Sequence, residues 1–359
     1  MLYRFAICLS LFISYVLVAP TSVHAGSYTF PAVGSQAENL SIYSSTDAER
    51  IEPLIKAFQK RNTATAVTYH ELSTIDVFEQ TKAEIDAHLP TADLTLSSAM
   101  DLQIKLVNDG YSQPHVSDEI ETLPKWANWR NEAVGFTYEP AVMVYNRRLA
   151  PDLSRITTRF ELANAINKKG FRLRGRVVTY DPAKSGLGYL FGTQDAIQSE
   201  DFWYLARSLG DSGVQQMSGS GDMIDKVASG EALIAYNVLG SYALARARKN
   251  PALAITLLQD YSLVMSRIAV ITKNAPNAEA AGRFIDFLLS REGQSLIAGP
   301  ASLYALRTDI KGAATAKTLQ EKNNGPLIPI RLGPGLLVYL DHMKRKDFLE
   351  RWQKTTHKK

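Results

Sequence analysis

The sequence predicts an α/β fold, in which helices cover both faces of a sheet. Short apolar segments typical of strands alternate with amphipathic segments of helical period, and helix-capping residues stand between the two kinds. The alternation begins near residue 40 and returns in the same style after residue 262. No internal repeat and no low-complexity tract interrupts it, which excludes solenoids and propellers.

The first α/β segment carries the clearest pattern. Ile51, Leu54 and Phe58 recur at helical spacing, and Gly110 marks the end of a later helix. We expect an irregular polar leader over residues 27–37. The predicted elements are then strand 40–43, helix 48–62, strand 66–72, helix 74–88, strand 93–96 and helix 99–109.

The rest of the chain continues the alternation less regularly. Residues 302–307 are predicted as a turn or short strand, and residues 325–335 are rich in Gly and Pro. The predicted elements are strand 136–145 interrupted at Pro140, helix 156–168, strand 177–180, helix 201–210, helix 223–229, strand 232–236, strand 262–271, helix 278–290 and a closing helix 336–353.

Length and composition limit the classes of protein. A chain of 359 residues suggests about two domains at roughly 150 residues each. The chain has 40 basic against 36 acidic side chains, interleaved almost throughout, so we expect no nucleic-acid partner. The single cysteine, Cys8, excludes a disulfide framework.

Residues 1–25 predict a cleaved secretory signal peptide. Arg4 precedes a mostly apolar run, and Val23-His24-Ala25 forms a cleavage site before Gly26. The run of about 15 residues is short for a membrane anchor, which needs roughly 20. Cys8 lies too far from the cleavage point for a lipid anchor. We therefore expect an exported, periplasmic protein without cysteine.

Hydroxyl-rich turns mark four points where a strand ends or a helix begins. In open α/β sheets such points hold ligands, because helix N-termini present free N–H groups and partial positive charge. Each turn alone fits an ordinary helix cap. Two turns come from the first segment and two from the middle, as a ligand held between two lobes would require, and that ligand should be anionic or rich in acceptor oxygens. The candidate residues are Ser44, Ser45, Thr46, Ser97, Ser98, Ser185, Gly186, Ser218, Gly219 and Ser220.

Several of these motifs together resemble a known family. They are the signal peptide, Ile42-Tyr43-Ser44-Ser45-Thr46-Asp47, Ala92-Asp93 before Ser97-Ser98, Gly135-Phe136 leading to Val144-Tyr145-Asn146, Asp181-Pro182 before Ser185-Gly186, and Gly230-Glu231-Ala232 before Ile234-Ala235-Tyr236. Their order is similar to that in type II periplasmic solute-binding proteins of ABC transporters, in the branch of ferric-ion, thiamine, phosphonate and sugar-phosphate binders. The resemblance covers residues 40–306.

The resemblance implies a type II periplasmic binding protein fold, with two discontinuous α/β lobes joined by two hinge strands. We expect the hinge strands near residues 135–145 and 262–271. Lobe 1 would comprise residues 38–136 and 268–306, and lobe 2 residues 137–267. Residues 307–359 would form a C-terminal extension that packs on lobe 2.

The resemblance also allows the ligand class to be narrowed. Ferric-ion binders of this family carry two adjacent tyrosines after the Gly-Glu strand, because phenolate is a hard ligand. In the corresponding region of this sequence the tyrosines are Tyr236 and Tyr242, which are not adjacent. Ferric iron is therefore kept as an alternative ligand. The mature histidines are scattered singly, so we expect no metal site and no cofactor.

The remaining residues favour a small organic anion, such as a sugar phosphate, a phosphoglycerate-like compound or a phosphonate. Arg267 lies among apolar neighbours, where a guanidinium needs a partner. It could clamp the anion or pair with Glu139, and Glu139 could instead accept hydrogen bonds from ligand hydroxyls. Further candidate ligand-binding residues are Tyr189, Tyr236 and Asn237, for which core packing is the other interpretation.

We expect a binding protein and not an enzyme. The sequence has no nucleophile elbow, P-loop, HExxH motif or dinucleotide fingerprint. The expected partners are the anionic ligand and either an ABC permease or a membrane sensor kinase, since either can recognise the closed shape. We expect a monomer.

Overall fold

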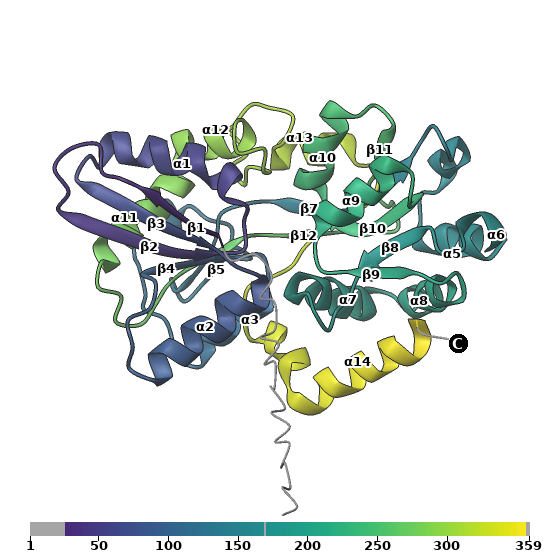
Figure 1. Ribbon diagram of the computed structural model, residues 1–359, viewed down its shortest axis with the longest axis horizontal. Helices are drawn as coiled ribbons and strands as arrows, with labels where there is room; N and C mark the ends of the chain where they lie inside the picture. Colours follow the sequence, from purple (N-terminus) through teal and green to yellow (C-terminus); the bar gives the residue numbers. More distant parts are fainter. Residues whose placement is uncertain (1–25, 169, 357–359) are drawn as a thin grey trace, which may run out of the picture.

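The computed structural model describes residues 26–168 and 170–356; the predicted signal peptide, residues 1–25, lies outside the described residues. Two seven-stranded sheets lie side by side, each covered by helices (Figure 1). The two-lobed α/β class predicted from the sequence is confirmed.

Lobe 1 is built on the sheet with strand order β1-β3-β2-β4-β13-β6-β5. Its strands are β1 (Gly26–Phe30), β2 (Glu38–Ser44), β3 (Thr65–Glu71), β4 (Leu94–Ser97), β5 (Asn128–Trp129), β6 (Ala133–Gly135) and β13 (Ile268–Ile271). Its helices are α1 (Ala48–Arg61), α2 (Thr74–Asp86), α3 (Met100–Asn108), α4 (Asp118–Glu121), α11 (Ala278–Leu289) and α12 (Arg291–Ala298). Because β2, β3 and β4 run parallel, the helices that follow them all begin at the same edge of the sheet.

Lobe 2 is built on the order β14-β12-β7-β10-β8-β9, with β11 paired to β7. Its strands are β7 (Glu139–Asn146), β8 (Val177–Tyr180), β9 (Gln215–Met217), β10 (Ile234–Leu239), β11 (Leu253–Thr256), β12 (Ser262–Met265) and β14 (Leu327–Pro329). Its helices are the 3₁₀ helix η1 (Pro151–Arg155), α5 (Arg159–Lys168), α6 (Gly170–Leu173), α7 (Gly186–Gln198), α8 (Asp201–Asp211), α9 (Ser220–Ser229) and α10 (Gly240–Lys249). The parallel strands β8, β9 and β10 again place the starts of α7, α9 and α10 at one edge.

The chain crosses between the lobes from β6 to β7 and from β12 to β13. The two crossings are hydrogen-bonded to each other: the Phe136 N–H donates to the Arg267 carbonyl at 3.0 Å, and the Arg267 N–H donates to the Thr137 hydroxyl at 2.8 Å. Glycine at position 135 permits this approach, because a Cβ there would lie 2.7 Å from the Ser266 hydroxyl oxygen. The hinge is therefore a paired and buried element.

The C-terminal segment touches both lobes. Helix α13 (Ala316–Lys322) packs beside the hinge, and β14 extends the sheet of lobe 2 parallel to β12. The 3₁₀ helix η2 (Pro334–Leu340) then lies against α3 of lobe 1, and α14 (His342–Thr356) runs along α8 of lobe 2 (Figure 1).

Some predicted elements are wrong in detail. The leader expected to be irregular contains β1, an edge strand whose side chains are mostly exposed, so it lacks the apolar run that marks a strand. The strand expected over residues 262–271 divides at Ser266-Arg267, where the chain leaves one sheet for the other. The closing helix divides at Asp341, whose ψ of 134° is extended. The break expected at Pro140 falls instead at residues 136–138, and Pro140 lies within β7.

Apolar packing unites the lobes as well as filling them. One buried cluster belongs to lobe 1 alone, around Phe58 and Phe284. A second continues from Met100 and Ile104 on α3 through the hinge into lobe 2, and includes Leu336 of the C-terminal segment. None of the helices in residues 26–168 and 170–356 has the length and hydropathy needed to cross a bilayer.

Candidate functional site

A cleft of about 340 Å³ opens between the lobes, at the edges where the helices begin. Lobe 1 contributes the segments after β2 and β4 and the start of α2, and lobe 2 contributes the starts of α7 and α9 with part of α10. The predicted site residues that line it are Ser45, Ser98, Ser185, Ser218, Gly219, Ser220 and Arg267. The structure therefore gathers residues from all four hydroxyl-rich turns into one cavity.

Ser45 and Ser98 form the wall on lobe 1. The Ser98 N–H donates to the Ser45 hydroxyl oxygen at 3.1 Å, and the two hydroxyl oxygens lie 3.5 Å apart. Ser44 and Ser97, one position earlier, are buried, and their hydroxyl oxygens accept hydrogen bonds from the chain two residues later. Neighbouring side chains at a strand end point in opposite directions, so only the second serine of each pair reaches the cleft.

Ser185 and Ser220 form the facing wall on lobe 2. Ser185 is the N-cap of α7 and accepts from the Gly188 N–H at 3.1 Å. The Ser220 hydroxyl oxygen, in the first turn of α9, accepts from the Leu239 N–H at 2.9 Å and is hydrogen-bonded to the Tyr180 hydroxyl. The N-termini of α7 and α9, with their partial positive charge, thus stand at the cleft.

Arg267 supplies a buried positive charge at the base of the cleft. Its Nε donates to Glu139 at 2.7 Å and its Nη1 donates to the Thr46 hydroxyl at 2.7 Å. Its Nη2 has no hydrogen-bond partner among the described residues, although the side chain is 1% exposed. Burial alone would lower the pKa of Arg267, but the Glu139 charge and hydrogen bond outweigh it and raise the pKa. The guanidinium is therefore charged, held at two nitrogens and free at the third.

Glu139 lies beneath the cleft and not on its wall. It is fully buried, and besides the Arg267 ion pair it accepts a hydrogen bond from the Ser241 hydroxyl. Of the two roles considered for Glu139, the structure contains the ion pair. Thr46 is likewise buried and acts as an acceptor for Arg267.

Four predicted residues lie away from the cleft. Gly186 and Tyr189 line a neighbouring cavity on the other side of the α7 N-terminus. Tyr236 and Asn237 both donate to the buried carboxylate of Asp195, at 2.8 and 2.6 Å. A β-bulge at these two positions, with φ of +62° at Asn237, directs them into the interior of lobe 2.

The cleft also contains residues that were not among the predicted ligand-binding residues. Tyr180 and Tyr242 line it, together with the charged side chains of Asp47, Lys184, Asp222 and Arg246. Burial first, with a contribution from the Asp47 charge, raises the pKa of Tyr242 to about 12, against the opposing effect of Arg267. Arg246 lies four residues after Tyr242, so both side chains lie on the same face of α10. This spacing could have identified Arg246 as a cleft residue from the sequence.

Direct contacts join the two walls. The Tyr242 hydroxyl of lobe 2 donates to Asp47 of lobe 1 at 2.8 Å, and the Arg50 guanidinium lies 4.0 Å from the Tyr242 ring centroid. The Gly186 N–H of lobe 2 donates to the Thr74 hydroxyl of lobe 1 at 3.0 Å. The structure is thus an arrangement in which the lobes touch beside the cleft.

The donor set of the cleft suits an oxygen-rich ligand. Three basic side chains and two acidic ones line it, along with many hydroxyl groups. Within residues 26–168 and 170–356, no group of three or more His, Cys, Asp or Glu side chains could hold a metal ion.

Comparison with known proteins agrees with this architecture. Residues 53–324 match a family described as bacterial extracellular solute-binding protein. A substrate-binding protein of an ABC transporter from Agrobacterium tumefaciens is 38% identical, with a TM-score of 0.86 over 93% of this chain and 99% of that chain. No protein with a curated description matches the sequence.

More distant solved structures share the fold. AfuA from Actinobacillus pleuropneumoniae, with fructose-6-phosphate bound, is 20% identical with a TM-score of 0.72, over 89% of this chain and 99% of that chain. Iron-bound HitA from Pseudomonas aeruginosa is 18% identical with a TM-score of 0.71, over the same shares. Proteins of this family bind solutes for transport and are not enzymes, as predicted. By sequence and by fold, the chain belongs to the bacterial extracellular solute-binding proteins.

Proposed function

We propose that this protein captures a small, oxygen-rich organic anion in the cleft and delivers it to an ABC permease from the periplasm. The anion would be a sugar phosphate, a phosphoglycerate-like compound or a phosphonate. The observation that carries the proposal is the Nη2 of Arg267, a buried charged donor with no hydrogen-bond partner among the described residues, on a side chain that lines the base of the cleft.

A free donor of this kind implies an acceptor that arrives with the ligand. An unsatisfied buried donor costs about 1 to 3 kcal/mol, and more when the group is charged. A phosphate or carboxylate oxygen would remove that cost and form a charge-assisted hydrogen bond. Glu139 and Thr46 hold the other two nitrogens, so the Nη2 position is set before the ligand enters.

The rest of the cleft suits the same ligand. Ser45, Ser98 and Ser185 supply hydroxyl groups, and the N-termini of α7 and α9 favour negative charge. A volume of about 340 Å³ falls in the range of small-molecule sites, roughly 300 to 1,000 Å³. AfuA, which shares the fold, has fructose-6-phosphate bound.

The binding cycle would use the hinge. An open form would expose the walls, the anion would bind, and the lobes would close about the paired crossings at Arg267 and Thr137. A permease would recognise the closed shape by its higher affinity for it. A sensor kinase could recognise the same shape, and uptake of the ligand by a strain lacking the protein distinguishes the two roles.

A thermal-shift screen of residues 26–359 against sugar phosphates, phosphoglycerates, phosphonates, dicarboxylates and inorganic phosphate tests the proposal. A ligand at 100 times its dissociation constant should stabilise the protein by about 2.7 kcal/mol. Ser185→Ala should weaken the shift. Ser290→Ala is a matched control, because Ser290 also caps a helix with a hydrogen bond of 3.1 Å but lies outside the cleft. Equal effects of the two variants, or no response to any anion, would contradict the proposal.

Ferric iron is the second candidate, because Tyr180 and Tyr242 both line the cleft and phenolate oxygens suit Fe(III). Both hydroxyls are already hydrogen-bonded, and burial raises the pKa of both. Iron binding would produce a visible tyrosinate charge-transfer band that Tyr242→Phe weakens. Such a band, in place of a response to anions, would favour iron.

A further inference from the structure

The C-terminal segment from residue 333 to residue 356, called the strap below, connects the lobes outside the cleft. It is anchored on lobe 2, where the Trp352 and Phe202 rings stack at 6.0 Å and the Trp352 Nε1 donates to Gln216 at 2.9 Å. The Tyr189 hydroxyl of α7 donates to the Tyr339 carbonyl of the strap. At its other end the strap lies against α3 of lobe 1 (Figure 1).

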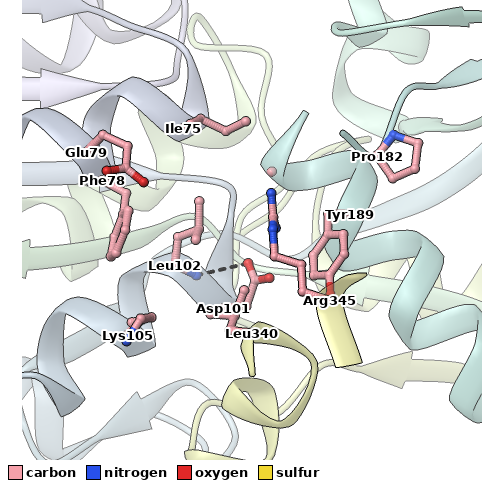
Figure 2. A pocket seen from close by; sticks show the side chains of 11 residues that line it. Ile75, Phe78, Glu79, Asp101, Leu102, Lys105, Pro182, Tyr189, Leu340 and Arg345 are labelled. Carbon is pink, nitrogen blue, oxygen red and sulfur yellow. Dashed lines mark hydrogen bonds between the residues drawn. The ribbon is translucent and has the colours of Figure 1, made fainter. Parts of the chain in front are cut away.

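A cavity of about 180 Å³, called the strap pocket, lies where these three parts meet (Figure 2). Its lining comes from α2 and α3 of lobe 1, from α7 of lobe 2 and from the strap, and it shares no residue with the cleft. At about 30 Å³ per water molecule, this volume holds roughly six waters or a ligand of similar bulk. Its apolar walls include Ile75, Phe78, Leu102 and Leu340.

The carboxyl group of Asp101, on α3, faces this cavity and has few hydrogen-bond partners (Figure 2). The residue is 3% exposed, and its Oδ1 accepts from the Leu102 N–H at 2.9 Å. No side chain of the described residues donates a hydrogen bond to this carboxyl, which is held by the backbone N–H groups of Leu102 and of Asp101 itself. Burial raises the pKa of this carboxyl to about 7. A buried acid beside a cavity, held only by adjacent backbone N–H groups, has capacity to accept a further hydrogen bond from a ligand.

Arg345 enters the same cavity from the strap. Its guanidinium lies 4.7 Å from the centroid of the Tyr189 ring. It forms no ion pair with Asp101 or with any other described residue, although its charge acts on the Asp101 carboxyl. Of the other charged groups in the lining, Lys105 pairs with Asp109 at 2.5 Å and Glu79 is exposed. The pocket thus holds one acid and one base that form no ion pair with each other.

We propose that the strap pocket is a second binding site, for a small zwitterion of the amino-acid class. The ammonium group would lie at Asp101, the carboxylate at Arg345, and an aliphatic side chain against Phe78 and Leu102. A ligand with both charges satisfies both groups at once, whereas a simple anion would meet the Asp101 carboxyl and a simple cation would meet Arg345.

Binding at this site would favour the closed arrangement. Lobe 1 holds Asp101, lobe 2 holds Tyr189 and the strap holds Arg345, so opening the lobes takes the pocket apart. A ligand that binds only the assembled pocket shifts the equilibrium toward closure by its difference in affinity for the two states. The zwitterion would therefore raise the affinity of the cleft for its own ligand, and the cleft ligand would raise affinity at the strap pocket by the same factor.

A thermal-shift and calorimetric titration of residues 26–359 with glycine, alanine, valine and leucine tests this site. Leucine is compared with 4-methylpentanoate, which lacks the amino group, and with 3-methylbutylamine, which lacks the carboxylate. We expect a shift from at least one amino acid and none from either fragment. At pH 7 about half of the Asp101 carboxyls carry a proton, so binding of an ammonium group should release protons, measured as a dependence of the binding enthalpy on the buffer.

Single-residue variants test whether the amino acid binds in the strap pocket. Asp101→Asn and Arg345→Met should each weaken amino-acid binding at least tenfold, while Ser290→Ala, which removes a helix cap outside both cavities, should leave it unchanged. Arg345 is only half-buried, so its variant remains informative if Asp101→Asn fails to fold. No response to any amino acid, or a response that survives both strap-pocket variants, overturns the proposal. An equal loss of the response in Ser290→Ala would show that it follows general stability and would also overturn the proposal, whereas the anion screen tests the cleft independently.

Discussion

The Tyr242 hydroxyl on lobe 2 donates a hydrogen bond of 2.8 Å to the Asp47 carboxylate on lobe 1. Asp47 precedes the first residue of α1, and Tyr242 lies in the first turn of α10, so two helix N-termini from opposite lobes meet at this contact. Because the two residues belong to different lobes, opening the lobes would break this contact. It therefore contributes to the closed state and not to the folding of either lobe.

Tyr242→Phe should weaken ligand binding several-fold without unfolding the protein. The variant removes one interlobe hydrogen bond, worth about 1 kcal/mol, which corresponds to roughly fivefold in affinity. Tyr111→Phe is the matched control, because Tyr111 donates to Asp86 at 2.7 Å within lobe 1. Calorimetric titration with the ligand found by the anion screen measures both. An equal loss in the two variants would show that the interlobe contact has no special role in closure.

Arg267→Met should destabilise the protein strongly, and Glu139→Gln in the same chain should restore much of the loss. Removing one member of a fully buried ion pair leaves an uncompensated charge and costs about 3 to 5 kcal/mol. The double variant removes both charges. Urea unfolding of the single and double variants gives the coupling energy. If the double variant is as unstable as the sum of the singles, the pair is not the source of the effect.

Asp101→Asn should change how stability depends on pH. The carboxyl has a folded-state pKa of about 7 and an ordinary value near 3.8, so between these values the folded state binds more protons than the unfolded state. The contribution of Asp101 to stability is therefore full at acidic pH and falls by a few kcal/mol as pH rises from about 4 to 7. Unfolding experiments at pH 4.5, 6 and 7.5 should show this fall in the native chain, reduced in the variant.

Asp86→Asn is the control for that experiment. Hydrogen bonds from Lys82 and Tyr111 lower the pKa of the Asp86 carboxyl, so its contribution is present above its ordinary pKa and lost at more acidic pH. The fall between pH 4.5 and 7.5 should survive in this variant. A pH profile of Asp101→Asn that matches the native one would mean that the acid is not buried in the folded protein.

Gly135→Ala should destabilise the hinge. The new Cβ would lie 2.7 Å from the hydroxyl oxygen of Ser266 in the second crossing, which accepts from the Thr137 N–H of the first crossing. Crowding of this kind costs about 1 to 3 kcal/mol. Gly335→Ala should be nearly neutral, because nothing lies within 4 Å of the added atom there. Adding Ser266→Ala should restore part of the stability, measured by urea unfolding; absence of any rescue would rule out this contact as the cause.

Much of the framework could be predicted from local patterns. The apolar stripe of α1 and the strand β8 follow directly from periodicity, and both stand close to their predicted bounds. Helix α7 was not predicted, because every residue from Gly186 to Thr193 is buried and this part of the helix has no polar face to reveal its period. The strand β1 was missed for the opposite reason, since its exposed edge position requires no apolar run.

The candidate site likewise has features that could be predicted from the sequence and features that could not. Residue types at strand ends and helix starts are local properties, so the sequence itself determined that Ser45, Ser98, Ser185 and Ser220 would stand at such points. Only the tertiary structure decided that Ser44 faces inward, that Tyr236 turns to Asp195, and that Glu139 and Thr46 leave one nitrogen of Arg267 free. The physical reason for this difference is that the hydrophobic period of a helix or strand depends only on residues near one another along the chain. The direction and partners of a buried polar group depend on segments distant in the sequence, 41 residues away for Tyr236 and Asp195 and 128 residues away for Arg267 and Glu139.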